Sequence, residues 1–164
     1  MDSYTTSFYR VDTVSMAENK IYTLYTNQYD EILKTGETPN NLQIAQKFVA
    51  NGYDVFLLSN PRGTKSADFI IRKKNILFYV EGKTSSGGSA LSGRLSEGAK
   101  QADRIVINLT NYSKLKRLAE NIKATFIQNP SLRELLIFKG LILIQIDRYL
   151  ITSKDYSKII FKEF

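Results

Sequence analysis

The sequence contains neither cysteine nor histidine, and each absence removes a class of functional site. Without cysteine, the chain has no disulfide framework and no zinc–thiolate centre. Histidine is the side chain whose unperturbed pKa lies nearest neutrality. Its absence removes Ser-His and Cys-His nucleophile systems, histidine-based acid–base pairs and histidine-bound metals. Any catalysis must therefore use carboxylates, lysine, arginine, tyrosine, serine or threonine.

Long apolar runs are missing as well. No stretch of about eighteen apolar residues occurs, so we expect no membrane span. The most apolar segment, residues 135–146, is interrupted by Lys139 and Gln145. The first residues are polar and lack the apolar core of a signal peptide. We therefore expect an exported form of the chain to travel as part of a larger protein.

Basic residues outnumber acidic residues by 23 to 16, which gives a net charge of +7. This excess favours a polyanionic partner, either nucleic acid or an anionic membrane surface. The alternative is a basic soluble domain without such a partner. The length of 164 residues and the hydrophobic content of 43% predict a globular domain with a buried core.

Hydrophobic periodicity and capping signals predict a succession of helices and strands. Ser15 and Glu18 form a capping box at the start of the first predicted helix. Asn40 or Asn41 begins the second helix, which Asn51-Gly52 ends. The other expected elements are helices over residues 15–34, 94–102 and 112–128, strands over 53–58, 66–72, 76–83, 104–109, 135–146 and 149–161, and a Ser/Gly-rich loop over 84–93.

The order of these elements predicts an α/β (α+β) fold, in which a mixed sheet is flanked by helices. We expect a single domain over residues 1–164, because no internal repeat or linker interrupts the sequence. Its core would span about residues 40–146, preceded by a helical extension over about residues 15–34.

Three charged residues on two predicted strands have no evident structural purpose: Asp68, Glu81 and Lys83. Residues i and i+2 of a strand project to one face, so Glu81 and Lys83 point the same way. The intervening hairpin is short enough to bring Asp68 near Glu81. A hard cation such as Mg²⁺ prefers carboxylate and carbonyl oxygens, which Asp68, Glu81 and the Gly82 carbonyl can supply. Lys83 can then orient or deprotonate a water, or offset phosphate charge.

The alternative explanation is an ordinary pair of a glutamate and a lysine on the solvent-exposed side of a strand. Such pairs contribute little to stability, and a glutamate two residues before a lysine is common in any sequence. The aspartate on the preceding strand, with helices on both sides of the hairpin, favours the metal site.

Asp68, followed after a hairpin by Glu81-Gly82-Lys83, resembles the motif of the PD-(D/E)XK nuclease superfamily. The order of helix, strand, hairpin, helix and strand resembles the core of that fold. More narrowly, the chain resembles the C-terminal toxin nuclease domains of contact-dependent growth inhibition (CdiA-type) and related polymorphic toxins. The segments that carry this narrower resemblance are 41–45, 52–55, 66–68, 80–84 and 100–103.

The resemblance implies a Mg²⁺-dependent endonuclease that cleaves RNA, in particular tRNA, or DNA. It implies that Asp68 and Glu81 are metal ligands and that Lys83 is the catalytic lysine. Gln101 matches a glutamine on the helix after the motif strand, where it contacts metal-bound water or a phosphate; a glutamine on a helix surface is the alternative. The resemblance further implies delivery by a larger secreted or cell-surface effector, action in the target-cell cytoplasm, and an acidic immunity protein.

One position departs from the pattern of this superfamily. An acidic residue is usual on the helix before the first core strand, and Gln43 stands in the matching region. Amide oxygens bind hard cations less well than carboxylates do. Asp30, Glu31 or Glu37 can serve instead, or the chain binds its metal weakly or is inactive.

Residues around the motif suggest a surface for the substrate. Lys65 and Arg94 are basic residues that can neutralise phosphates, and the backbone N–H groups of the loop that begins at Thr84 and Ser85 can contact one. Tyr53 and Tyr79 are candidates for stacking on unpaired bases, although most aromatic residues belong to cores. Two other functions stay open: a non-catalytic nucleic-acid-binding module and a DNA-processing nuclease of a mobile element.

Overall fold

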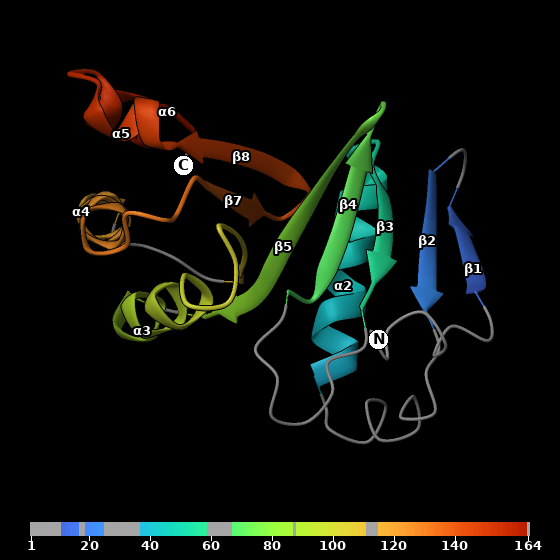
Figure 1. The fold of residues 1–164 in the computed structure, drawn as a ribbon. Coiled ribbons are helices and arrows are strands. Elements are labelled where there is room, and N and C mark those ends of the chain that lie inside the picture. Colours follow the sequence, from blue (N-terminus) through green and yellow to red (C-terminus); the bar gives the residue numbers. More distant parts are fainter. Residues whose placement is uncertain are drawn as a thin grey trace. The chain divides into compact units, whose positions relative to one another are not determined.

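A computed structural model describes residues 11–16, 19–24, 37–58, 67–86, 88–110 and 115–163 (Figure 1). The chain divides into two compact units, Met1–Val80 and Glu81–Phe164. Strand β5 (Ile76–Ser85) contributes its first half to the first unit and its second half to the second. The single domain over residues 1–164 stays a prediction, and each unit is described by itself.

The first unit combines one described helix with paired strands. Its strands follow the chain in the order β1-β2-β3-β4-β5, and among the described strand pairs of this unit only β2–β3 is parallel. The elements are β1 (Val11–Met16), β2 (Asn19–Leu24), α2 (Glu37–Ala50), β3 (Asp54–Leu57), β4 (Phe69–Lys73) and the first half of β5.

The helix predicted over residues 15–34 is wrong where the structure describes it. Residues 11–16 and 19–24 form an antiparallel pair of strands, in which Ser15 lies opposite Lys20 rather than capping a helix. These segments are rich in valine, isoleucine, threonine and tyrosine, which favour strands. Pairing with β3 favours the extended conformation further. The remainder of the predicted helix, residues 25–34, lies outside the described residues.

Helix α2 begins at Glu37, earlier than the predicted cap at Asn40 or Asn41. Pro39 is tolerated in its first turn because the first N–H groups of a helix have no intrahelical partner. The predicted end is confirmed: the helix stops at Ala50, and Gly52 adopts a φ of +82°, a left-handed conformation that favours glycine.

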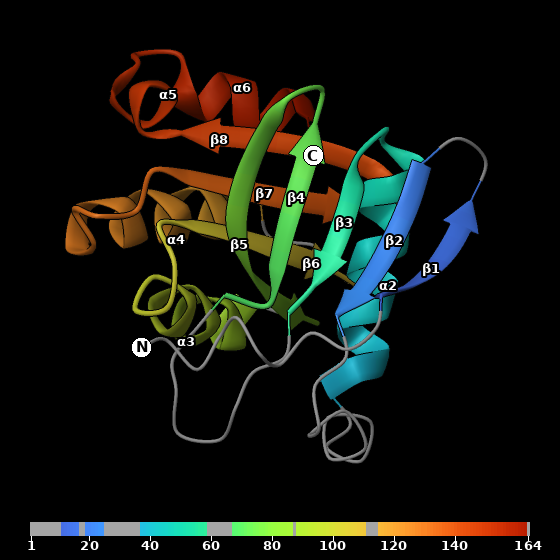
Figure 2. The same cartoon turned by 45° about the vertical axis from the view of Figure 1, so that its right-hand side comes forward.

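The second unit has four paired strands and all the other described helices. The second half of β5 pairs in parallel with β6 (Arg104–Leu109), β6 pairs in parallel with β7 (Glu134–Lys139), and β7 pairs antiparallel with β8 (Ile142–Asp147) (Figure 2). The helices are α3 (Gly88–Gly98), α4 (Leu115–Gln128), α5 (Arg148–Thr152) and α6 (Tyr156–Glu163).

One face of the second unit's strands is buried under these helices. Ile105 and Ile107 of β6 belong to the same core cluster as buried residues of all four helices, among them Leu95, Phe126 and Ile160. The helix predicted over residues 112–128 is confirmed where the structure describes it, and Leu118, Ile122 and Phe126 of α4 are all buried. The second half of β5 pairs with β6 and therefore lies beside this core.

The α/β (α+β) fold class, with mixed strand pairing flanked by helices, is confirmed. Two predicted segments of the second unit are wrong. Residues 149–161 form α5 and α6 rather than a strand, because Tyr156 and Ile160 at helical spacing face the core and Asp147 caps α5 by accepting from the Leu150 N–H. The predicted loop over 84–93 is mostly regular: β5 runs to Ser85 and α3 begins at Gly88.

None of the described helices is long and apolar enough to cross a membrane.

Candidate functional site

Glu81 and Lys83 lie side by side on β5, as their spacing predicts. The Lys83 Nζ donates a hydrogen bond to Glu81 Oε1 over 2.6 Å. In the parallel pairing with β6, Glu81 lies opposite Ile105 and Lys83 opposite Ile107. The ion pair therefore occupies the face of β5 that continues the helix-covered core of the second unit.

Glu81 is buried and Lys83 is mostly buried, so the pair is not the solvent-exposed surface pair considered as the alternative. The side chains of Lys83 and Glu81 are 17% and 2% exposed. Removing two charges from water is costly, and their mutual attraction offsets that cost only partly. A buried ion pair is thus a weak source of stability. Removing either partner leaves an uncompensated charge.

The opposite face of β5 carries Gly82 and Thr84. Thr84 lies opposite Asn108 in β6, and Asn108 is fully buried within an otherwise apolar run. The Thr84 Oγ1 is buried and has no hydrogen-bond partner among the described residues. Asn108 was not among the predicted site residues, although a single amide in the run Arg104–Leu109 was the available signal.

Ser85 is the last residue of β5 rather than part of a flexible loop. It is buried, and its carbonyl accepts hydrogen bonds from the Thr110 N–H at 3.1 Å and the Thr110 hydroxyl at 3.3 Å. Its backbone is therefore tied to the end of β6. The roles of Thr84 and Ser85 in substrate binding stay predictions.

Asp68 is a buried carboxylate of the first unit, one residue before β4. Its carbonyl accepts a hydrogen bond from the Leu58 N–H at 2.9 Å, which fixes its backbone beside the end of β3. Glu81 belongs to the second unit. Joint metal binding by Asp68 and Glu81 therefore stays a prediction.

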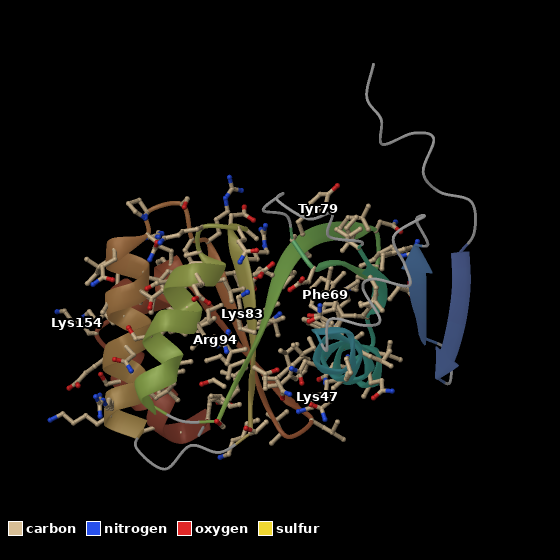
Figure 3. All side chains as sticks on the ribbon, turned by 90° about the horizontal axis from the view of Figure 1, so that it is seen from below. Lys47, Phe69, Tyr79, Lys83, Arg94 and Lys154 are labelled. Carbon is tan, nitrogen blue, oxygen red and sulfur yellow. The ribbon has the colours of Figure 1, made fainter. Side chains whose placement is uncertain are left out.

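The other predicted site residues are more scattered. Gln43 is an exposed residue of α2 in the first unit. Gln101 is not on a helix as predicted but in the turn after α3, where its N–H donates to the Gly98 carbonyl. Arg94 is exposed on α3, with a guanidinium nitrogen 3.7 Å from a Glu97 oxygen (Figure 3). Lys65, Asp30 and Glu31 lie outside the described residues, and Glu37 begins α2.

The two tyrosines considered for base stacking differ in exposure. Tyr53 is 4% exposed and packs edge-to-face on Phe48 with ring centroids 5.3 Å apart, so it cannot stack on a ligand. Tyr79 is 59% exposed on β5. Only Tyr79 of this pair is accessible.

The donor chemistry of the motif suits a hard cation. No group of three or more His, Cys, Asp or Glu residues gathers within the described residues, so a closed protein cage for a metal is absent there. Mg²⁺ is commonly held by one or two carboxylates, with the remaining positions filled by water and substrate phosphates. Glu81 and Asp68 are the candidates for such carboxylates.

No protein-family model matches the chain, and no curated protein matches it. Among solved structures, the chain is similar to a CdiA-CT/CdiI toxin and immunity complex from Burkholderia pseudomallei. The identity is 21%, the TM-score is 0.47, and the match covers 70% of this chain and 87% of the other. At this identity and TM-score the likeness assigns neither a family nor an activity.

Proposed function

We propose that the chain is a metal-dependent nuclease that cleaves phosphodiester bonds of RNA, in particular tRNA, or DNA. The observation that carries the proposal is the buried Glu81–Lys83 pair, with 2.6 Å between the ammonium and the carboxylate. Such a pair contributes little to stability, so a chemical role offers a reason for holding a carboxylate and an amine together there. The lack of histidine leaves these groups as the available chemistry.

Each residue of the motif has a separate role in this proposal. Glu81, together with Asp68, would hold Mg²⁺. When bound, the cation supplies Lewis-acid chemistry at a phosphoryl oxygen and lowers the pKa of water. Lys83 would donate a hydrogen bond to a phosphate oxygen and offset the charge that develops on it. Gln101 and Gln43 would contact the substrate or its waters.

The sequence resemblance extends the proposal to a biological role. The chain would be a toxin domain, delivered by a larger effector and active in the cytoplasm of a target bacterium. An acidic immunity protein is the expected partner, because the net charge of +7 attracts a protein of opposite charge. Growth arrest on expression, relieved by such a partner, would support this role against a nuclease of a mobile element.

A non-catalytic nucleic-acid-binding module is the second candidate. It is favoured by the lack of a three-carboxylate group within the described residues and by Gln43 at the position where an acid is usual. In that case the chain binds nucleic acid in the presence of Mg²⁺ without cutting it.

The test incubates the purified chain with total tRNA and with plasmid, in Mg²⁺ or in EDTA. Wild type is compared with Asp68→Asn, Glu81→Gln and Lys83→Ala, and Lys158→Ala serves as control because it breaks an exposed ion pair with Asp155 in the second unit. We expect cleavage by wild type and the control in Mg²⁺ alone, and loss of cleavage in the other three. Circular dichroism of each variant shows that the fold is retained. Equal cleavage by all five proteins would overturn the site.

A further inference from the structure

The first unit presents one face of its strands that α2 does not cover. Residues alternate between the two faces of a strand, and cross-strand partners share a face. The register aligns Phe56, Ile70 and Tyr79 across β3, β4 and β5, and aligns Arg72 with Leu77 in the next row. We call these five residues the open face.

The other face of the same strands is the packed one. Val55, Phe69, Ile71 and Val80 are buried there. Helix α2 packs against β3 and contributes its own buried residues, among them Phe48. Figure 3 shows Phe69 on the side of α2 and Tyr79 on the far side of the strands. The described core of the unit therefore lies on one face of these strands, and the open face is the other.

Apolar and aromatic groups are accessible on the open face. Leu77 and Tyr79 are each 59% exposed, and Phe56 and Ile70 beside them are partly exposed. A single exposed apolar residue needs no explanation, but adjacent ones on one face mark an interaction surface. The flat surface of a strand pair gives an aromatic ring such as Tyr79 the geometry to stack on a planar group.

Positive charge borders these aromatic groups. The Arg72 guanidinium lies 5.7 Å from the centre of the Phe56 ring, and its Nε donates to Asp54 at 2.9 Å. At the hairpin between β4 and β5, Lys74 is exposed, whereas the Lys73 ammonium belongs to the packed face, where it lies 4.5 Å from the centre of the Tyr53 ring. Lys74 has a φ of 57°, which is uncommon for a residue other than glycine, asparagine or aspartate. A lysine thus occupies a position of the hairpin where a glycine would be less strained.

We propose that the open face binds unpaired bases of a nucleic acid, with Tyr79 stacking on a base and Lys74 contacting the backbone. Aromatic side chains on a sheet, bordered by basic residues, are the usual means of binding single strands and loops. The nucleic acid as ligand rests on the proposed function. A second copy of the chain is disfavoured because each copy carries +7.

The chain contains no tryptophan, so Tyr79→Trp places the single tryptophan of the variant at the stacking position, and its emission can be followed selectively. We expect its emission to be quenched by a single-stranded 12-mer and not by a blunt duplex of the same sequence. The titration is made in EDTA, so that no metal-dependent cleavage occurs. Tyr149→Trp is the matched control, because Tyr149 is 85% exposed and lies in the second unit. No quenching at position 79, or equal quenching at both positions, would overturn the proposal.

Fluorescence anisotropy with the labelled 12-mer measures the energetic weight of Tyr79. Tyr79→Ala should raise the Kd for the single strand about 5- to 100-fold, while Tyr79→Phe and Tyr149→Ala stay near wild type. Lys74→Ala should reduce the slope of log Kd against log salt by about 0.7, as expected for one phosphate contact on a single strand. An unchanged Kd in Tyr79→Ala would exclude the open face as the binding site for the single strand. An acidic protein would then be the remaining candidate to bind that face.

These binding measurements can reject the open face independently of the proposed nuclease function. A wild type that does not cleave, but whose single-strand binding depends on Tyr79, supports the open face and rejects the nuclease. A wild type that cleaves, with binding independent of Tyr79, rejects the open face and leaves the nuclease in place.

Discussion

In the second unit, the side chain of Arg148 makes several interactions with residues far from it in the sequence. Arg148 donates hydrogen bonds to the carbonyls of Phe126, Asn129 and Leu132 at 2.7–3.1 Å, and its guanidinium lies 5.4 Å from the centre of the Phe126 ring. These carbonyls belong to the last turn of α4 and the residues after it, which have no helical N–H partner. Arg148 thereby joins the start of α5 to the end of α4.

Replacing Arg148 by methionine should lower the free energy of unfolding by about 2–3 kcal/mol, because the carbonyls lose a charged donor that water replaces only in part. The urea midpoint at constant m-value measures the change. Arg133→Met is the control. Arg133 is 71% exposed and pairs with Asp103 at 3.2 Å, so its loss should cost less than about 0.5 kcal/mol. Equal losses in both variants would contradict this role of Arg148.

Glu134 provides a pH dependence at the residue scale. Burial raises the pKa of Glu134 above its ordinary value, against the opposing effect of the Arg104 guanidinium, whose Nε lies 3.2 Å from its carboxylate. A folded-state pKa above the unfolded one adds stability below the unfolded pKa, and this stability is lost as pH rises through the folded pKa.

We therefore expect Glu134→Gln to compare more favourably with wild type at pH 7 than at pH 4, because the variant has no charge to bury. Unfolding free energies of both proteins at the two pH values, from urea titrations, give the comparison. If the unfolding free energy of Glu134→Gln minus that of wild type falls as pH rises, the attraction of Arg104 outweighs the effect of burial on Glu134.

At the scale of elements, two of the three glycines of α3, Gly93 and Gly98, have different surroundings. A Cβ at Gly93 would meet nothing within 4 Å, whereas a Cβ at Gly98 would lie 3.2 Å from three side-chain carbons of the buried Ile105. Gly98 thus permits α3 to approach β6 closely, which helps to hold the helix that follows Glu81 and Lys83 on the core.

Gly93→Ala should raise the free energy of unfolding by about 0.5–1 kcal/mol, because alanine favours the helix. Gly98→Ala should instead lower it by about 1 kcal/mol, because Ile105 must shift in a closely packed core. Thermal melts of the two variants make a matched pair. A stabilising Gly98→Ala would show that α3 adjusts without cost to β6.

The elements also show what local sequence signals can and cannot predict. The strand Arg104–Leu109 and the end of α2 at Gly52 follow from an unbroken apolar run and a glycine cap. The segment 19–24 was predicted to be helical, because spacings such as Ile21 to Leu24 fit a helix, whereas pairing with β3 favours a strand. The segment 149–161 was predicted to be a strand but forms α5 and α6. Such short segments depend on tertiary partners that no local pattern contains.

The candidate site divides in the same way. The contact of Glu81 with Lys83 follows from strand alternation alone. Its burial does not follow from strand alternation, which places Glu81 and Lys83 on one face without saying whether that face is covered. Gln101 was predicted to lie on a helix but lies beyond the end of α3, because that helix begins at Gly88, inside the Ser/Gly segment that was expected to be a loop, and ends at Gly98.

At the scale of the whole molecule, the protein combines a basic net charge, the Glu81–Lys83 ion pair and the open face. The net charge of +7 draws nucleic acid to any exposed surface, so binding alone does not identify the site of chemistry. The central claim is that the Glu81–Lys83 pair is catalytic rather than structural.

The initial rate of tRNA and plasmid cleavage in Mg²⁺, for wild type and Lys83→Ala at equal nucleic-acid occupancy, tests that claim most directly. We expect Lys83→Ala to lower the rate at least about 100-fold, the loss typical of a group that stabilises transition-state charge. A variant that stays folded and cleaves at the wild-type rate would contradict the account, because Lys83 would then serve only to neutralise Glu81.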